Sequence, residues 1–355
     1  MSDQTPPDPS QWSCPAPTQA SDTVQLAHGG GGRLTQKLIE SVFVPALRNP
    51  ALEVLHDGAL LSLPPGRIAF STDSYVIDPI FFPGGDIGSL AVHGTVNDLA
   101  MCGARPLHLS AGFILEEGLP LADLRRIVAS MGRAAAEAGV AVVTGDTKVV
   151  DRGKGDGIFI NTAGIGIVPE GVGIAPTRAR AGDLVLVNGE IAVHGIAILS
   201  VRQGLEFATE MVSDSASLHE LVAAALDVAG SHLHVLRDPT RGGVASALNE
   251  IATAAGVSIE LEERSIPVNE AVQGACELLG FDPLYVANEG KCLAIVAPSH
   301  AKAVLDAWRR HPLGKDAAII GQVREEPRGR LVLHTRIGAR RIVDMLSGEQ
   351  LPRIC

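Results

Sequence analysis

Four aspartates occur in otherwise apolar stretches of this sequence. Asp73 lies within RIAFSTDSYVI, and Asp98 lies within TVNDLAM. Asp146 follows the apolar run at 140–143, and Asp238 precedes a predicted helix. A carboxylate in apolar surroundings is costly unless it is paired or bound to a metal. Each aspartate alone is an ordinary turn or cap residue. The four together predict a convergent acidic cluster that holds Mg²⁺, a hard cation that takes carboxylate and phosphate oxygens.

A glycine-rich segment supplies a second kind of site. The run HGGGGR places Gly29, Gly30, Gly31 and Gly32 directly before a predicted helix. Residues without a Cβ permit turns that aim several backbone N–H groups at one phosphate, although a flexible joint would have the same composition. The run is neither GxGxxG nor GxxxxGK[ST], so it does not identify a class of nucleotide site by itself.

Other polar residues are candidates for binding the same ligand. Asn97 lies one helical turn from His93, so the two side chains share a face of their predicted helix. Thr144 and Gly145 open the segment TGDTK, which also contains Asp146. We expect Asn97 and the Thr144–Asp146 segment to contribute to nucleotide binding.

Three side chains are candidates for the reacting centre. Lys148 closes TGDTK and could neutralise a phosphate, and Glu289 in NEGK could move a proton, although each could also be a surface charge. The chain ends LPRIC, so Cys355 carries a thiol and the terminal carboxylate on one α-carbon. A terminal thiol can enter the pocket of another protein without a clash, and a tail that starts at Arg341 spans at most about 50 Å.

Composition excludes several classes of protein. The 355 residues are 46% apolar and 19% charged, with a formal net charge of −11. The length predicts two domains of about 150–200 residues each. No apolar run is long enough for a membrane span, and no basic run follows a phosphate backbone, so we expect neither a membrane nor a nucleic-acid partner.

The cysteines indicate a reducing compartment. Five cysteines lie far apart and form no CxxC pair, which favours the cytoplasm over a disulfide framework or a zinc site. We expect Cys102, Cys276 and Cys292 to be small core residues and Cys14 to be incidental.

The apolar periodicity predicts two α+β domains without strict βαβ alternation. Residues 1–22 are predicted to be a disordered extension, 23–172 and 173–340 the two domains, and 341–355 a flexible tail outside the core. Strands are predicted at 59–63, 67–77, 106–118, 141–150, 157–168, 182–190 and 291–298. Helices are predicted from the glycine run to residue 48 and at 87–102, 121–139, 192–204, 242–256 and 299–311.

Seven segments together resemble the HypE family of nickel–iron hydrogenase maturation proteins. They are HGGGG, FSTDSYVIDPIFFPGGDIGSLAVHGTVNDLAMCGARP, AGFILEEGLP, TGDTKVV, DPTRGG, NEGK and the terminal PRIC. The resemblance runs from about residue 24 to the last residue, and the segment 70–106 is the most specific. HypE proteins belong to the PurM-like ATP-binding superfamily, together with aminoimidazole ribonucleotide synthetase, selenophosphate synthetase and thiamine-monophosphate kinase.

The resemblance implies a fold and a ligand set. The fold would be a two-domain PurM-like α+β structure that forms a homodimer through strands of the N-terminal domain. The glycine run and the aspartates would hold ATP with Mg²⁺. On the family's pattern Asp73, Asp98 and Asp238 are the metal-side acids, and Asp57 in HDGAL is a further candidate.

The resemblance also implies a reaction. A HypF-type carbamoyltransferase would place a carbamoyl group on Cys355, and this chain, as an ATP-dependent carbamoyl dehydratase, would convert the thiocarbamate to a thiocyanate. The cyanide would then pass to iron on a HypC–HypD scaffold complex. We expect Lys148 to stabilise charge on the amide oxygen and the transferring phosphoryl group, and Glu289 to take a proton from nitrogen.

Two other functions are open at this point. Another ATP-dependent member of the superfamily, such as a selenophosphate synthetase or a small-molecule kinase, would not need the terminal PRIC. A nucleotide-binding scaffold that only docks maturation partners would not need several carboxylates beside a glycine run. Replacement of Cys355 by alanine separates the first from a dehydratase, and an ATP-dependent mass loss of one water rejects the second.

Overall fold

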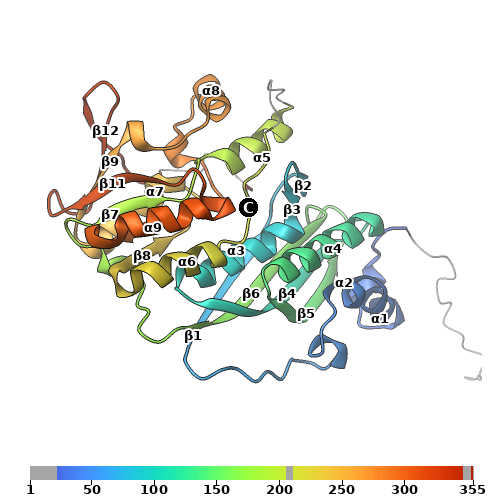
Figure 1. Ribbon diagram of the computed structural model, residues 1–355. Helices are drawn as coiled ribbons and strands as arrows, with labels where there is room; N and C mark the ends of the chain where they lie inside the picture. The colour runs from blue at the N-terminus through green and yellow to red at the C-terminus, as the bar shows by residue number, and fades with distance from the viewer. Residues whose placement is uncertain (1–21, 205–210, 347–352, 355) are drawn as a thin grey trace, which may run out of the picture.

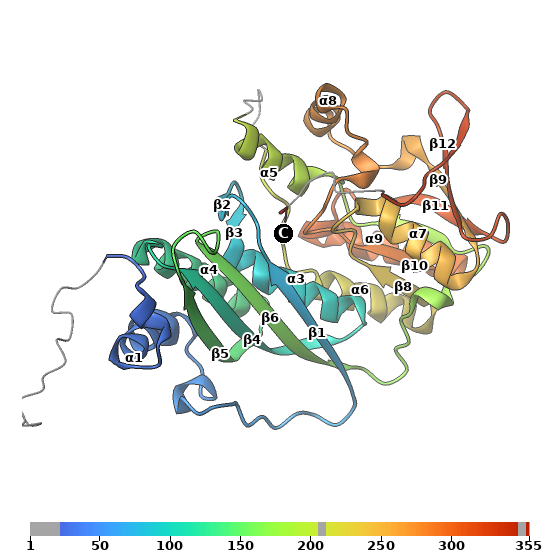
Figure 2. The same cartoon turned by 180° about the vertical axis from the view of Figure 1, so that it is seen from behind.

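The computed structural model describes residues 22–204, 211–346 and 353–354. Within them the chain forms two halves, each a sheet with helices packed on it, which lie next to each other in Figures 1 and 2. The first half holds a four-stranded sheet and the second a seven-stranded sheet. The predicted α+β class is therefore confirmed. No helix in the described segments is long and apolar enough to cross a membrane.

The N-terminal sheet has the strand order β1–β6–β4–β5. Its strands are β1 (Arg67–Tyr75), β4 (Arg105–Glu116), β5 (Ala141–Val150) and β6 (Ile158–Val168). Along β6, buried side chains alternate with partly exposed ones because helices α3 (Ile87–Met101) and α4 (Leu121–Glu137) cover only one face. Figure 2 is seen from the uncovered face.

The uncovered face of this sheet is rich in apolar side chains. Phe70 is 70% exposed, Ile68 is 55% exposed and Ile114 is 45% exposed. An apolar sheet face of this kind is energetically unfavourable in water and is typical of an interface with another chain.

Helix α3 lies between the two halves and carries several candidate residues. Asp86 begins the helix, because its carboxylate accepts from the backbone N–H groups of Gly88 at 2.8 Å and Ser89 at 3.1 Å. Gly103 has a φ of 72° just after the helix, which confirms the predicted left-handed end. Most of α3 is buried, because it packs on the N-terminal sheet, on α4 and on α6 (His219–Ala229) of the second half.

The glycine run leads into a helical segment, as predicted. A 3₁₀ helix (Leu26–Gly29) precedes α1 (Arg33–Leu38), a π-helical turn (Ile39–Phe43) and α2 (Val44–Leu47). Asn49 ends this segment and ties it to the sheet, since its amide donates to the carbonyl of Val142 at 2.8 Å. The glycine run is therefore held beside strand β5.

The C-terminal sheet has the order β13–β12–β9–β11–β7–β10–β8. Helices pack on both of its faces, so strand β10 is buried at every position. The strands are β7 (Leu184–Val187), β8 (Leu233–Arg237), β9 (Ser258–Glu262), β10 (Leu293–Val296), β11 (Ala318–Arg324), β12 (Arg330–His334) and β13 (Arg340–Ile342). Besides α6, the helices are α5 (Val193–Gln203), α7 (Gly243–Ala255), α8 (Glu270–Leu279) and α9 (Pro298–Arg310).

Three expectations from the sequence are wrong. Residues 59–63 form no strand, because they pair with no neighbouring strand in the described chain. Cys102 is exposed at the C-terminal cap of α3, whereas Cys276 and Cys292 are buried as predicted. The final segment does add to the core, since Val343 is 0% exposed and Ile354 is 2% exposed.

Candidate active site

Three of the predicted acids converge where the two halves meet. Asp73 comes from β1, Asp98 from α3, and Asp238 directly follows β8. The hydroxyl of Ser71 donates to Asp98 Oδ2 at 2.6 Å, which fixes that carboxylate toward β1. Asp98 and Asp238 line one cavity of about 460 Å³. The sequence therefore predicted correctly that these carboxylates come together.

The carboxylates repel one another. Burial, followed by repulsion from Asp98, raises the pKa of Asp238 to about 7. Burial raises the pKa of Asp98 as well, with a further contribution from Asp73. A cation would relieve this repulsion. Within the described residues, however, no group of three or more acidic, histidine or cysteine side chains is arranged to hold a metal ion.

Glu289 lies beside these acids on the loop before β10. Its side chain is 4% exposed. Burial, and then repulsion from Asp238, Asp214, Asp73 and Asp98, holds its pKa well above the usual range for a carboxyl group. A carboxylate in this environment is a strong base once it is ionised.

Asn97 fastens the Glu289 loop to helix α3. Its amide nitrogen donates to the carbonyl oxygens of Ala216 at 3.0 Å and Glu289 at 3.3 Å. Its amide oxygen accepts from the backbone N–H of Leu218 at 2.7 Å. Both amide protons are used inside the chain, so Asn97 positions the Glu289 loop in this structure, and its contact with nucleotide stays a prediction.

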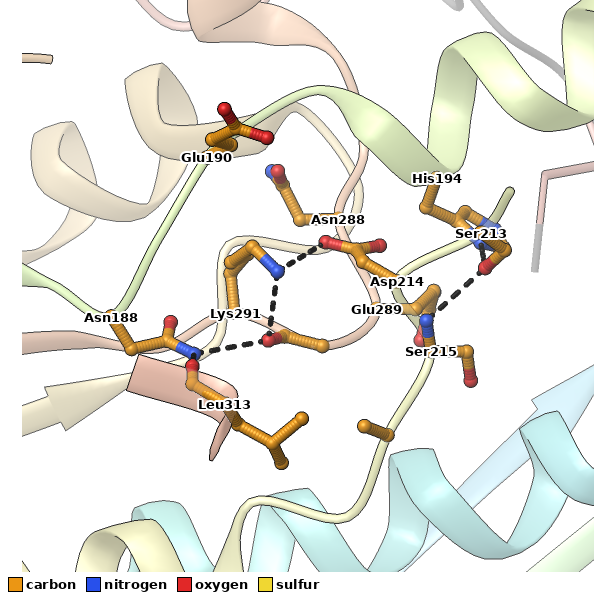
Figure 3. Close-up of polar contacts among 12 residues, drawn as sticks. Asn188, Glu190, His194, Ser213, Asp214, Ser215, Asn288, Glu289, Lys291 and Leu313 are labelled. Atoms are coloured by element: carbon orange, nitrogen blue, oxygen red, sulfur yellow. Dashed lines mark hydrogen bonds and ion pairs between the residues drawn. The ribbon is translucent and has the colours of Figure 1, made fainter. Parts of the chain in front are cut away.

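An ion pair holds the other side of the Glu289 loop (Figure 3). Lys291 Nζ lies 2.8 Å from Asp214 Oδ2, and their side chains are only 12% and 9% exposed. Asn188 donates to the carbonyl of Gly290 at 3.2 Å. A Cβ at Gly290 would overlap the Asp214 carbonyl oxygen, so only glycine permits this close approach. The loop that carries Glu289 is therefore fixed from several directions.

The last described residues reach this same region. Ile354 accepts a hydrogen bond from His194 on its carbonyl oxygen at 2.9 Å. Ser213, which contacts His194 at 2.7 Å, lies next to Asp214 in sequence. Figure 3 shows His194 and Ser213 beside the Glu289 loop. Cys355 itself lies outside the described residues.

The predicted nucleotide-binding residues form a second, separate location at strand β5. Gly31, Thr144, Gly145 and Asp146 line a cavity of about 490 Å³. The rest of its lining includes apolar side chains of the helical segment and of the chain that follows it: Ile39, Phe43, Val44, Leu47, Leu52 and Leu55. A polar strand edge opposite an apolar wall suits a ligand with a charged part and a flat apolar part.

The other residues predicted for binding lie around this cavity. Gly29 packs against Val149 of β5 so closely that a Cβ would overlap it. Gly30 and Gly32 flank Gly31 in the exposed part of the glycine run. Asp57 is exposed between His56 and Gly58, which both line the cavity, so it lies near β5 and not with the other predicted metal ligands.

The two locations are at opposite edges of the N-terminal sheet. Asp73 pairs with Thr162, which pairs with Ala111, which pairs with Gly145, so three strand spacings, or about 14 Å, separate β1 from β5. The prediction of a four-acid cluster is therefore wrong for Asp146 within one chain. The strand order decides this, and the sequence does not reveal it.

Lys148 and Asp146 form an exposed ion pair at 2.7 Å. Lys148 pairs in register with Ile114, which is 45% exposed on the uncovered face. The Lys148 side chain therefore points to the face that another chain would cover, and away from Glu289 of its own chain. Attraction to Lys148 lowers the pKa of Asp146.

Several residues of the site escaped the sequence analysis. They are His194, Ser213, Asp214, Ser215 and Asn188, together with the pairing of Lys291. The available signal was a polar residue inside an apolar helix, as in AVHGIAILS around His194. Its partners come from distant segments, so no local pattern identifies them.

Comparison with known proteins finds relatives for both halves of the chain. Residues 55–168 match the family described as AIR synthase related protein, N-terminal domain, and residues 180–334 match the corresponding C-terminal domain. A carbamoyl dehydratase HypE from Azotobacter vinelandii is 58% identical over 94% of this chain and 97% of its own.

Solved structures of HypE proteins are also similar to this chain. The crystal structure of hydrogenase maturation protein HypE in complex with ATP is 52% identical, covers 93% of this chain and 99% of its own, and has a TM-score of 0.90. A crystal structure of a HypE–HypF complex is 47% identical, covers 89% of this chain and 100% of its own, and has a TM-score of 0.77.

Proposed function

The chain belongs to the HypE family of carbamoyl dehydratases, and we propose that it uses ATP to dehydrate a carbamoyl group on its own Cys355. The product is a thiocyanate that supplies the cyanide ligand for iron in nickel–iron hydrogenase. The close relatives favour this function over a selenophosphate synthetase, a small-molecule kinase or a nucleotide-binding scaffold.

The reaction makes defined demands on the site. The oxygen of S–C(=O)–NH₂ is a poor leaving group, so it must be phosphorylated before it departs. It then leaves as phosphate, and loss of both N–H protons completes S–C≡N. The site must therefore place phosphate, a base and the thiol-bound carbamoyl group together.

Glu289 is the base in this proposal. It is buried among other carboxylates, which makes its ionised form strongly basic, and its loop is fixed by Asn97 and by the Lys291–Asp214 ion pair. Asp73, Asp98 and Asp238 would hold Mg²⁺, whose preferred ligands are carboxylate and phosphate oxygens. When bound, Mg²⁺ would neutralise charge on the phosphates and on the repelling carboxylates.

The separation of the two locations supports a homodimer. The cavity with Gly31 and the Thr144–Asp146 segment suits ATP, whereas the carboxylates lie about three strands away. If a second copy covers the apolar sheet face, the Lys148 side chain of one copy points toward that second copy, and we infer that it meets the carboxylate edge there. Lys148 would then stabilise negative charge on the amide oxygen and the phosphoryl group in the partner's site.

The partners follow from the same reaction. A HypF-type carbamoyltransferase would load Cys355, as supported by the similarity to a solved HypE–HypF complex, and a HypC–HypD complex would receive the cyanide. We place the reaction in the cytoplasm, which suits the free thiols of Cys102, Cys276 and Cys292.

The docking of Ile354 carries this proposal, because its contacts with His194 and with the apolar cluster that includes Ala287 bring the residue bonded to Cys355 close to the Glu289 loop. The test is intact-mass analysis after incubation with the carbamoyltransferase and carbamoyl phosphate, with ATP added or withheld. We expect a carbamoyl gain and then an ATP-dependent loss of one water, both absent in Cys355→Ala. A Glu289→Gln chain should gain carbamoyl but lose no water. ATP-dependent water loss that persists in this variant would contradict the role of Glu289.

A further inference from the structure

His194 sits at the centre of a directional chain of hydrogen bonds that ends on the chain terminus. The imidazole is 0% exposed. Nδ1 lies 2.7 Å from Ser213 Oγ, and Nε2 lies 2.9 Å from the carbonyl oxygen of Ile354. Ser213 Oγ also accepts from the backbone N–H of Ser215 at 3.1 Å.

The partners determine the tautomer of the ring. A carbonyl oxygen only accepts, so Nε2 must carry the proton and donate to Ile354. Burial lowers the pKa of His194, which keeps the ring neutral and leaves Nδ1 as an acceptor. The Ser213 hydroxyl therefore donates to Nδ1, and its own oxygen remains available to Ser215. Phe82 packs edge-on against the ring at 5.7 Å between centroids, which further limits its rotation.

Other groups hold the same two terminal residues. The guanidinium of Arg202, in the last turn of α5, donates to the carbonyl of Arg353 at 2.7 Å. The guanidinium of Arg353 lies 2.8 Å from Asp156 of the N-terminal half. The Ile354 side chain is 2% exposed and belongs to the core cluster of that half. The carbonyl groups and the side chains of both Arg353 and Ile354 therefore contact other parts of the chain.

We propose that His194 is a positioning residue whose Nε2–H holds the Ile354 carbonyl and so keeps the residue bonded to Cys355 beside the Glu289 loop. This inference rests on the proposed function only in one respect, namely that the Cys355 thiol carries the carbamoyl group. The peptide bond joins Ile354 directly to Cys355, so a fixed Ile354 carbonyl restricts the volume that the thiol can sample. The Ser213 hydroxyl orients the ring for this contact.

Two isosteric variants separate this role from a general role in packing. The amide nitrogen of glutamine at position 194 reaches the place of Nε2 and keeps the donor to Ile354. The amide of asparagine reaches only the place of Nδ1 and keeps only the contact with Ser213. Both variants shrink a buried ring, so a loss of packing alone would affect both.

The readout is the rate at which a bulky maleimide labels Cys355 in the full-length protein without ATP, followed by mass spectrometry of the C-terminal peptide. We expect His194→Asn to raise the rate about tenfold, as for one lost buried hydrogen bond. We expect His194→Gln to stay within about twofold of the parent. Equal rates in all three proteins, or equal increases in both variants, would overturn the proposal.

A surface variant keeps the test decisive if His194→Asn does not fold. Arg202→Met removes the donor to the Arg353 carbonyl at an accessible position, and we expect labelling to rise severalfold. Lys302→Met on the outer face of α9, where the lysine side chain is 84% exposed, is the matched control and should leave the rate unchanged. An unchanged labelling rate in Arg202→Met would show that the terminus is not held by these contacts.

The labelling assay needs neither ATP nor the carbamoyltransferase, so its result is independent of the proposed function. The catalytic consequence is measured separately on carbamoylated protein. In His194→Asn the maximal rate of water loss should fall while the KM for ATP stays the same, because the variant changes presentation of the thiol and not nucleotide binding. A changed KM with an unchanged maximal rate would contradict positioning by His194.

Discussion

The arrangement of the two locations predicts that each active site is built from two chains. Lys148 lies on β5 and points to the uncovered face, whereas Glu289 lies beside the carboxylates near β1, about 14 Å away across the sheet. An extended lysine side chain spans only about half of that distance. In a dimer, Lys148 of one chain would therefore act with Glu289 of the other.

Heterodimers with one lesion in each chain test this directly. One chain carries Lys148→Ala and the other Glu289→Gln, with different affinity tags so that the heterodimer can be purified. If sites are shared, one of its two sites receives both lesions and the other receives neither. The expected rate of ATP-dependent water loss is then half that of the parent dimer, although each variant homodimer is inactive.

The matched control places both lesions in one chain and pairs it with a parent chain. Shared sites then each receive one lesion, so this heterodimer should be inactive. If Lys148 and Glu289 act within one chain, the two results exchange: the first heterodimer is inactive and the control has half the parent rate. That exchange would refute the shared site while leaving both residues essential.

Three further predictions follow from buried and exposed groups. Phe70→Lys should dissociate the dimer, because the 70% exposed ring contributes about 3 kcal/mol of apolar burial per chain; sedimentation that still shows a dimer at micromolar concentration would contradict this. Burial raises the pKa of Asp238 to about 7. The folded chain therefore keeps a proton that the unfolded chain releases above about pH 4. As a result, the free energy of unfolding falls as the pH rises from about 4 toward 7. Without divalent cations Asp238→Asn should lack that decline and gain about 2 kcal/mol above pH 7 in urea unfolding. This is half of the full three-unit shift, because Asp238 keeps part of its surface exposed to solvent; parallel pH profiles would argue against it. Gly290→Ala should lose about 1–3 kcal/mol of stability because its Cβ meets the Asp214 carbonyl, whereas Gly274→Ala, with open space around it, should lose none.

The sequence predicted those features that depend on neighbouring residues. Helix α3 begins after Asp86 and ends at Gly103, as their capping preferences indicate. The alternating strands β1, β4, β5 and β6 were also predicted. The convergence of Asp98 with Asp238 followed from the cost of isolated carboxylates in apolar segments.

Features that depend on strand order or on distant contacts were not predictable in this way. Asp146 has the same local pattern as Asp98, yet the position of β5 at the far edge removes it from the cluster. The hydrogen bonds of Asn97 were not foreseen, because its amide is used by a loop more than a hundred residues later in the chain. The burial of Ile354 depends on contacts with residues of both halves, so a short irregular terminus gave no sign of it.

The docked terminus also joins the two halves of the molecule. His194 and Arg202 belong to the second half, whereas Asp78 and Asp156, which contact Arg353, belong to the first. Thermodynamic linkage makes this reciprocal: whatever stabilises the contact between the halves also favours the docked terminus, and the docked terminus stabilises that contact to the same degree.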